Sequence, residues 1–275
     1  MFSRVYIEIT NVCNMSCSFC HGHSRPARFM SLDEFRTLLT KIGGKTKYIY
    51  YHLMGEPLLH PLLPDFIREA SEKGYRSVIT TNGTLLGETG KALIDSGVYK
   101  VNVSLHSFEE NNPEAQEAYL KEVISFADTA SEKGIIVVLR LWNNGFDEGR
   151  NDTVLKLLRK CLDGEWAENT RGLRIRDKLH IEWGDRFQWP DRAADVQGEE
   201  VFCYGLRDHF GILCDGTVVP CCLDSDGVIG LGNVFNDDID EILGSPLAQN
   251  ICEGFSKRRA VHELCRRCGY AQRFV

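Results

Sequence analysis

The stretch that decides the fold is "VYIEITNVCNMSCSFC", Val5 to Cys20, in which three cysteines directly follow an apolar, β-branched run. Three residues separate Cys13 from Cys17, and two separate Cys17 from Cys20. Three thiols at this spacing fit a zinc site with a fourth ligand, a redox pair, or an iron–sulfur cluster.

The spacing favours the cluster over the other two sites. A structural zinc site usually has four ligands in paired spacing, and the nearest histidines, His21 and His23, directly follow the last cysteine. A redox pair would use Cys17 and Cys20 and leave Cys13 unexplained. Three thiolates on a [4Fe–4S] cube leave one iron without a protein ligand, and that iron can bind a small molecule directly.

Length and composition limit the classes of protein that remain. The 275 residues are 43% hydrophobic, which is enough for one large domain or for one large and one small domain. A net charge of −7 disfavours a nucleic-acid partner. The N-terminus lacks the apolar run of a signal peptide, and no segment approaches the roughly 20 apolar residues that cross a bilayer. We therefore expect a cytoplasmic protein whose 11 cysteines are reduced and available as ligands.

Strand and helix patterns alternate through the first two-thirds of the chain. A capping box at Ser31 and Glu34 predicts a helix start, and Gly74 and Gly134 predict two helix ends. The six predicted strands are Val5–Ile9, Tyr48–Leu53, Ser77–Thr80, Val101–Leu105, Ile135–Leu141 and Leu179–Trp183. Six such units predict an α/β fold with parallel strands, a partial (β/α)6 TIM-like barrel that is open on one side. Ligands should gather at the C-terminal ends of its strands.

The pattern changes after about residue 190, where cysteines become frequent and the alternation stops. The run "FGILCDGTVVPCC", Phe210 to Cys222, predicts a β-hairpin that turns at Asp215-Gly216. We predict a barrel domain over residues 1–190, a linker over 191–198 and a small cysteine-rich domain over 199–275.

The cysteine spacing, with Phe19 before the last cysteine and a strand before the first, resembles the radical S-adenosylmethionine (radical SAM) enzyme superfamily. The resemblance implies that the open iron chelates the amino and carboxylate groups of S-adenosylmethionine. It also implies that one electron, from a reductase such as flavodoxin or ferredoxin, cleaves the sulfonium and releases a 5′-deoxyadenosyl radical. This radical would then abstract a hydrogen atom from the substrate.

Further motifs follow later strands in the order of that family. "MGEP" resembles the GGEP motif that holds the methionine amino group, with Met54 in place of the first glycine. "TTNGT" matches a common turn, Ser104 matches a residue that often contacts the ribose, and Arg140 is placed to pair with the methionine carboxylate. Each motif alone is also compatible with an ordinary turn or a surface ion pair. The resemblance assigns to the cofactor Phe19, Met54, Gly55, Glu56, Pro57, Asn82, Ser104 and Arg140.

The C-terminal cysteines resemble the SPASM/twitch group of these enzymes, which bind an auxiliary [4Fe–4S] cluster. The resemblance implies as ligands Cys203, Cys221, Cys265 and Cys268. Since seven residues follow Cys268, we expect the short, one-cluster twitch form. A four-cysteine zinc ribbon remains an alternative. Cys214 or Cys222 could replace one of the four ligands, or could donate a hydrogen atom to a substrate radical, which would make the enzyme an epimerase.

The run "EWGDRFQWP" after the last predicted strand offers polar groups beside aromatic ones near the open face of the barrel. Trp183, Asp185 and Arg186 are the candidate substrate residues, and ordinary packing is the alternative for them. Three side chains are candidates for a general base, namely His52, Glu182 and Asp185.

The layout is most similar to the butirosin-pathway dehydrogenase type of radical SAM enzyme, which oxidises a secondary alcohol to a ketone. We therefore expect oxidation of a small molecule, with the auxiliary cluster as electron acceptor. One alternative is peptide modification by thioether formation or epimerisation, although the early position of Cys13 leaves no room for an N-terminal leader-binding domain. The other is a non-catalytic iron–sulfur or zinc-binding scaffold.

Overall fold

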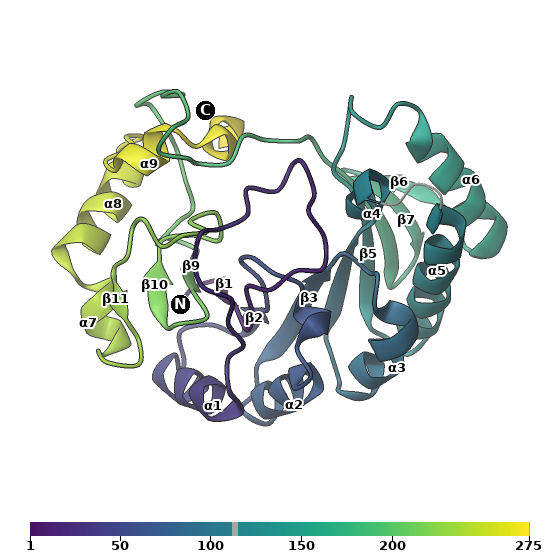
Figure 1. Cartoon of the computed structure of the whole chain (residues 1–275), viewed down its shortest axis with the longest axis horizontal. Coiled ribbons are helices and arrows are strands. Elements are labelled where there is room, and N and C mark those ends of the chain that lie inside the picture. Colours follow the sequence, from purple (N-terminus) through teal and green to yellow (C-terminus); the bar gives the residue numbers. More distant parts are fainter. Residues whose placement is uncertain (112–114, 275) are drawn as a thin grey trace.

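The fold is an open, curved β-sheet with helices on its outer side (Figure 1), in a computed structural model that describes residues 1–111 and 115–274. The strands are β1 (Arg4–Ile7), β2 (Tyr48–Tyr50), β3 (Arg76–Thr81), β4 (Lys100–Ser104), β5 (Ile136–Leu141), β6 (Ala167–Asn169), β7 (Gly172–Arg176), β8 (Leu179–Trp183), β9 (His209–Ile212), β10 (Thr217–Val219) and β11 (Gly232–Asn233). Their order in the sheet is β11-β10-β9-β1-β2-β3-β4-β5-β8-β7-β6.

The helices of the described residues cover the convex face of this sheet. They are α1 (Leu32–Lys41), α2 (Leu63–Glu72), α3 (Leu86–Asp95), α4 (Leu105–Asn111), α5 (Gln116–Glu132), α6 (Arg150–Cys161), α7 (Ile239–Leu243), α8 (Pro246–Ser256) and α9 (Glu263–Arg266), with 3₁₀ turns at Pro57–Leu59 and Gly269–Phe274. None of them combines the length and apolar character that a membrane span requires.

The predicted partial barrel is confirmed. The neighbouring strands β1, β2, β3, β4, β5 and β8 are all parallel and correspond to the six predicted strands. The capping box of α1 is present, because Ser31 accepts a hydrogen bond from the backbone of Glu34 while the Glu34 side chain accepts one from the backbone of Ser31. Gly74 and Gly134 have φ of 81° and 85°, the left-handed conformation that ends α2 and α5.

The parallel strands present two different faces. Residues such as Val5, Ile7 and Ile49 are fully buried in the large core between the sheet and the helices. The intervening Tyr6 belongs to a second, small core on the concave side, where it packs with Leu53, Leu213 and Val219. Because side chains alternate between the faces of a strand, the residues that share the orientation of Tyr6 line the interior of the barrel.

The predicted hairpin is also confirmed, since β9 and β10 are antiparallel and Gly216 turns between them with a φ of 88°. The sequence did not predict that β9 pairs in parallel with β1, with Val5 opposite Phe210. Nor did it predict the short, largely polar strands β6 and β7, which add an antiparallel pair beside β8. The hairpin of the cysteine-rich region thus extends the barrel sheet directly, and the domain boundary near residue 190 stays a prediction.

Candidate active site

The three cysteines of the first cluster lie in the loop that leaves β1 and crosses the mouth of the barrel (Figure 1). The Cys20 amide donates to the Cys17 carbonyl at 3.0 Å, which forms a tight turn. Cys17 Sγ lies 3.8 Å from the carbonyl oxygen of Ser107, just after β4. Cys13 and Cys20 are exposed and Cys17 is partly exposed. The loop therefore presents accessible thiols at the C-terminal ends of the parallel strands.

The loop after β2 packs tightly against this cysteine loop. Gly55 has a φ of 76°, and a Cβ atom there would lie 2.4 Å from the carbonyl oxygen of Thr10. The next amide, of Glu56, donates to the carbonyl of Val12 at 2.8 Å. Only glycine allows this approach, so the motif "MGEP" fixes the chain that leads into Cys13.

The carboxylate of Glu56 joins the loops after β2 and β3. It is 2% exposed. One oxygen accepts from Leu58 N at 2.9 Å and Thr81 Oγ1 at 2.7 Å, and the other accepts from Asn82 N at 2.7 Å. Burial raises the pKa of Glu56 to about 7 in spite of these donors. Glu56 thus holds the two loops together.

The turn that contains Asn82 is tied to the cysteine loop by a residue that sequence reasoning missed. Asn82 Nδ2 donates to Asn14 Oδ1 at 2.9 Å, and Asn14 Nδ2 donates to Thr84 Oγ1 at 2.9 Å. The Thr84 hydroxyl in turn donates to Asn82 Oδ1 at 2.7 Å. An asparagine beside Cys13 was a visible polar signal, but its partner lies 68 residues away, which no local pattern reveals.

Arg140 lies inside the barrel on β5, opposite Ser104 of β4 and Glu182 of β8. Its Nε is buried without a hydrogen-bond partner in the described residues, and its guanidinium lies 4.7 Å from the Trp142 ring centroid. Burial lowers the pKa of Arg140, while Glu182 acts in the opposite direction. Arginine remains charged in proteins, so this desolvated fork is suited to a ligand carboxylate.

The stretch after β8 lies against the cysteine loop at Phe19. Trp189 Nε1 donates to the Phe19 carbonyl at 2.9 Å, and the Arg186 guanidinium lies 5.3 Å from the Phe19 ring centroid. His106 contacts the same ring at a centroid distance of 5.0 Å. Phe19 is therefore fixed by residues from two distant segments.

The three candidate substrate residues have different surroundings. Trp183 packs against the large outer core, on the opposite face of β8 from Glu182. Asp185 is exposed and accepts from Asn144 Nδ2 at 2.8 Å. The structure brings Arg186, alone of the three, to the cysteine loop.

The four predicted auxiliary ligands line one cavity. Cys203, Cys221, Cys265 and Cys268 surround it together with apolar side chains such as Phe255. Burial raises the pKa of Cys203 to about 11 and raises those of the other three thiols as well. No three His, Cys, Asp or Glu side chains of the described residues converge on a single metal-ion position. Four thiols around an apolar cavity are a donor set that fits an iron–sulfur cluster.

The remaining candidate cysteines have separate surroundings. Cys222 packs with the small interior core, and its thiol hydrogen-bonds with Tyr6 on β1. Cys214 is fully buried, and its thiol donates to the Ile9 carbonyl at 3.5 Å. Of the two, Cys222 faces the barrel interior, while Cys214 fastens the hairpin to the end of β1.

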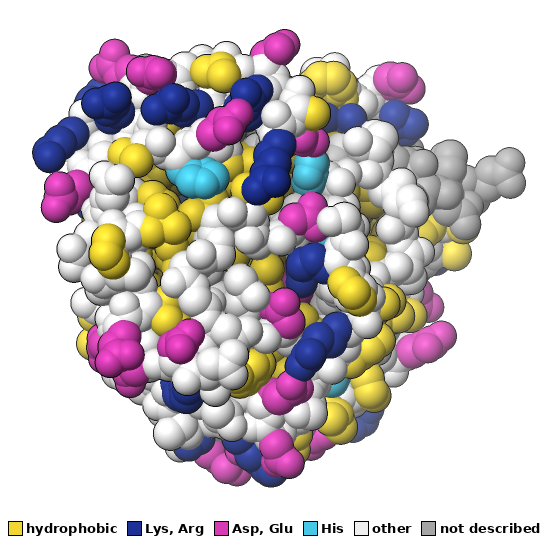
Figure 2. Space-filling model, turned by 60° about the vertical axis from the view of Figure 1, so that its left-hand side comes forward, with side chains coloured by type: hydrophobic (Ala, Val, Ile, Leu, Met, Phe, Trp, Pro, Cys, Tyr) yellow, Lys and Arg dark blue, Asp and Glu magenta, His cyan; other side chains and the backbone are white. Residues whose placement is uncertain are grey.

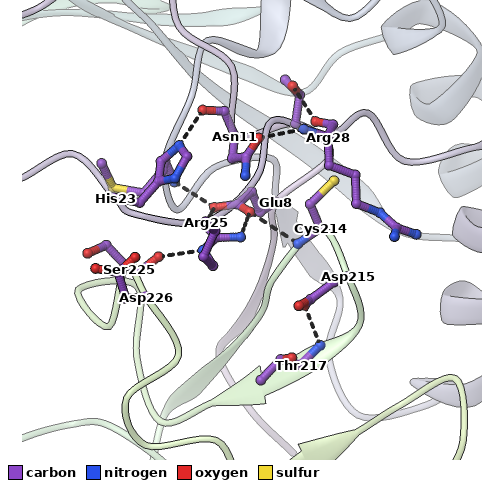
Figure 3. Close-up of polar contacts among 12 residues, drawn as sticks. Glu8, Asn11, His23, Arg25, Arg28, Cys214, Asp215, Thr217, Ser225 and Asp226 are labelled. Atoms are coloured by element: carbon purple, nitrogen blue, oxygen red, sulfur yellow. Dashed lines mark hydrogen bonds and ion pairs between the residues drawn. The ribbon is translucent and has the colours of Figure 1, made fainter.

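A buried ion pair connects these parts (Figure 3). Both oxygens of Glu8, at the end of β1, accept from the Arg25 guanidinium at 2.7 Å. They also accept from the amides of Cys214 at 3.1 Å and Met54 at 3.2 Å. Arg25 Nε donates to the Ser225 carbonyl at 2.8 Å. The loop of the first cluster, the "MGEP" loop and the hairpin region thus meet at one carboxylate.

The surface of the C-terminal region is locally basic although the whole chain is acidic. Figure 2 shows several Lys and Arg side chains, with Asp and Glu side chains among them, along the upper edge of the molecule. Between Cys252 and Phe274, Glu253 and Glu263 are the acidic residues, and the basic ones are Lys257, Arg258, Arg259, Arg266, Arg267 and Arg273. This surface borders the cavity of the four cysteines, because Arg266 and Arg267 separate Cys265 from Cys268.

Comparison with known proteins defines the family. Residues 7–159, more than half of the chain, match the radical SAM superfamily, and the chain belongs to this superfamily. Residues 203–269 match SPASM, an iron–sulfur cluster-binding domain. The chain is accordingly a radical SAM enzyme that uses S-adenosylmethionine and a [4Fe–4S] cluster, with an auxiliary cluster in its C-terminal region.

Individual relatives agree in fold and differ in activity. The chain is 36% identical over 109 residues to the GTP 3′,8-cyclase of Chlorobaculum tepidum, a match that covers 38% of this chain and 33% of that protein. The chain thus spans about a third of the length of this curated relative. The structure of BtrN with AdoMet and 2-DOIA has a TM-score of 0.64 at 19% identity and covers 98% of this chain and 93% of BtrN. Streptococcus suis SuiB with its precursor peptide SuiA has a TM-score of 0.61 at 15% identity, covering 98% of this chain and 70% of SuiB.

Proposed function

We propose that this enzyme reductively cleaves S-adenosylmethionine and oxidises a small molecule by two electrons, with the auxiliary [4Fe–4S] cluster as electron acceptor. The observation that carries the proposal is the position of two thiol sets around one polar barrel interior. Cys13, Cys17 and Cys20 lie at its mouth, and Cys221 is followed directly by Cys222, whose side chain faces that interior. A substrate in the interior is therefore accessible to both sites.

The chain supplies the contacts that position S-adenosylmethionine. The Arg140 fork pairs with the methionine carboxylate, and the chain around Gly55 and Glu56 receives the amino group. Ser104 and Asn82 stand at the neighbouring strand ends and would help to hold the cofactor, Ser104 at its ribose. Held by these residues, the cofactor and its cluster would supply a 5′-deoxyadenosyl radical for removal of one hydrogen atom from the substrate.

The protein completes the oxidation by accepting the electron and the proton that the substrate then releases. After loss of the hydrogen atom, the substrate would give one electron to a cluster held by the four auxiliary cysteines and one proton to a base. We assign the proton to Glu182, which faces the interior beside Arg140, because Asp185 is exposed and His52 has a pKa lowered by burial to about 3. Cys214 and Trp183 take packing roles in this proposal, since their side chains contact β1 and the outer core.

Two of the comparisons support a small substrate, whereas SuiB was solved with a precursor peptide. The fold agrees with BtrN over nearly the whole of both chains, and the Chlorobaculum relative is named for a reaction of GTP. The first electron would come from a reductase such as flavodoxin or ferredoxin, and the basic surface around α9 suits a carrier of acidic character.

Iron, sulfide and zinc content of anaerobically reconstituted protein test the proposal, together with deoxyadenosine release after reduction. We expect about eight iron per chain in the parent, and about four when Cys13, Cys17 and Cys20 are replaced by Ala or when Cys221 is replaced by Ala. The first variant should lose S-adenosylmethionine cleavage, whereas Cys221→Ala should keep cleavage and lose the oxidised product. Cys161→Ala, at an exposed cysteine of α6, should match the parent.

Two outcomes contradict the proposal. Zinc in either thiol set of the parent would support the scaffold interpretation. Absence of deoxyadenosine from the reduced parent, with both clusters present, would exclude radical chemistry of this type.

A further inference from the structure

The interior of the barrel is rich in cationic and aromatic side chains. The residues that share the orientation of Tyr6 include Arg4 on β1, Lys100 on β4 and Arg140 on β5. The Arg4 guanidinium lies 5.8 Å and 5.6 Å from the ring centroids of Tyr6 and Tyr50, which places it inside. Tyr6 also contacts His52 and His209 at ring distances of 5.4 and 5.5 Å.

Buried polar atoms without a partner concentrate on this interior. In the described residues they include the nitrogens Arg4 Nε, His52 Nδ1, Arg140 Nε, Trp142 Nε1 and His209 Nδ1, and one acceptor, Asn102 Oδ1. Folded proteins satisfy nearly all buried polar groups, with protein, water or ligand. The arginine and tryptophan nitrogens are donors only, so their partners must be acceptors. The interior is thus prepared for an acceptor-rich molecule.

The pKa shifts of the interior residues also indicate an excess of positive charge. Burial lowers the pKa of His52 to about 3, and Arg140 and Arg4 lower it further. Burial also lowers the pKa of Lys100, where Arg140 and Arg4 act in the same sense and Glu182 opposes them. Arg4 and Arg140 therefore act on both His52 and Lys100 through the interior, and Glu182 is a carboxylate that opposes them at Lys100.

S-adenosylmethionine does not remove this excess of positive charge. Its carboxylate can pair with Arg140, but it brings an ammonium and a sulfonium group, which together outweigh that carboxylate. The Arg4 guanidinium hydrogen-bonds with Tyr50, and the cofactor offers no second carboxylate to Arg4 or Lys100, which lie on the strands on either side of β2 and β3. Burial of cations without a partner is costly, so a second anion in the interior is favourable.

We propose that the substrate is an acidic small molecule, and that Arg4 and Lys100 bind its carboxylate or phosphate group inside the barrel. This inference rests on the proposed function and narrows its substrate class. The Tyr6 and Tyr50 rings form the apolar wall next to the anion, and Cys222, hydrogen-bonded to Tyr6, connects that wall with the cavity of the auxiliary cysteines. An anion at Arg4 would place the substrate beside the auxiliary site.

Calorimetric titration of the reconstituted protein, loaded with S-adenosylmethionine, tests the site with three probes: inorganic phosphate, succinate and uncharged glycerol. We expect phosphate or succinate to bind, and the tighter of the two to identify the acidic group. Arg4→Gln and Lys100→Gln should each weaken that binding about tenfold or more, and Arg4→Lys should weaken it less. Glycerol should not bind measurably.

Arg159 provides a matched control. It lies on α6, outside the barrel, and stacks on Trp166 with its guanidinium 4.4 Å from the ring centroid, and it is exposed. Arg159→Gln should bind the anions like the parent. The proposal is overturned if neither anion binds the parent, or if Lys100→Gln and Arg4→Gln bind them as tightly as Arg159→Gln does.

Deoxyadenosine release without substrate separates this inference from the proposed function. If the reduced parent cleaves S-adenosylmethionine but binds neither anion, the radical chemistry stands and the acidic substrate class is wrong. If the reduced parent does not cleave S-adenosylmethionine, the proposed function is wrong, whether or not the anions bind.

Discussion

Glu8 and Arg25 form a two-point ion pair in which both Nη–Oε distances are 2.7 Å and the carboxylate is completely buried (Figure 3). Arg25 is 12% exposed and lies in the loop that follows the three cysteines. Two backbone amides, of Met54 and Cys214, complete the hydrogen bonds of the carboxylate. This pair is therefore the contact through which the sheet holds the cluster loop in place.

Loss of Arg25 alone should be strongly destabilising. Arg25→Met leaves the buried Glu8 charge unpaired, and removal of one partner from a buried pair costs about 3–5 kcal/mol. Chemical denaturation should show a lower free energy of unfolding of that size. The double variant Glu8→Gln/Arg25→Met should recover part of the loss, because it removes the unpaired charge. A single Arg25→Met variant as stable as the parent would contradict this account.

Gly55→Ala should impair S-adenosylmethionine binding. The new Cβ would lie 2.4 Å from the Thr10 carbonyl oxygen, at a φ of 76° that L-residues adopt at a cost of roughly 1–2 kcal/mol. The backbone that leads into Cys13 must then move. Equilibrium dialysis should show at least about tenfold weaker S-adenosylmethionine binding, and denaturation should show reduced stability.

The Gly44→Ala variant tests the effect of the left-handed backbone conformation without the effect of a close contact. Gly44 has a nearly equal φ of 73°, but no atom lies within 4 Å of the Cβ position. This variant should lose only the roughly 1–2 kcal/mol of the left-handed conformation and bind S-adenosylmethionine like the parent. Equal cofactor affinities for the two variants would show that the packing of Gly55 on Thr10 is not needed.

Local sequence patterns predicted the parts of the fold that depend on local physics. The apolar run at Val5–Ile9, the capping box at Ser31 and the turn at Gly216 each follow from properties of a few adjacent residues. They were enough for a parallel, barrel-like sheet and a C-terminal hairpin. The resemblance to the SPASM/twitch group likewise implied four C-terminal thiols, and these share one cavity.

The parts that sequence did not predict depend on contacts between distant segments. The pairing of Val5 with Phe210 joins strands about two hundred residues apart, and no local pattern specifies such a partner. The buried Glu8 carboxylate is satisfied by residues 17, 46 and 206 positions away. The sequence therefore predicted the motifs of the active site but not the Glu8–Arg25 ion pair that brings them together.

The stability of the protein should fall in mild acid through His52. Burial lowers its folded-state pKa to about 3, below the ordinary value of 6.5, so the unfolded chain binds a proton first as the pH falls. The contribution of neutral His52 is complete above pH 6.5 and decreases as the pH falls towards about 3. Between pH 6.5 and pH 5.5 the loss should be about 1 kcal/mol.

Denaturation of cluster-loaded protein at pH 7.5 and pH 5.5 checks this effect. His52→Gln should lose less stability between the two pH values than the parent does. His209→Gln should also lose less stability than the parent between these pH values, because burial lowers the pKa of His209 as well, to about 4. If both variants keep the full acid sensitivity of the parent, neither histidine is its source.

Arg140→Lys should weaken S-adenosylmethionine binding although the positive charge is kept. A lysine ammonium cannot offer the forked pair of donors that matches a carboxylate, and it cannot stack on the Trp142 ring as a planar guanidinium does. We expect a dissociation constant about tenfold higher, with cluster iron unchanged. Arg159→Lys is the control, since Arg159 stacks on Trp166 at 4.4 Å on the outside of the barrel. If the two lysine variants bind S-adenosylmethionine equally, the carboxylate does not pair with Arg140, and the unpartnered Nε of this residue must serve the substrate instead.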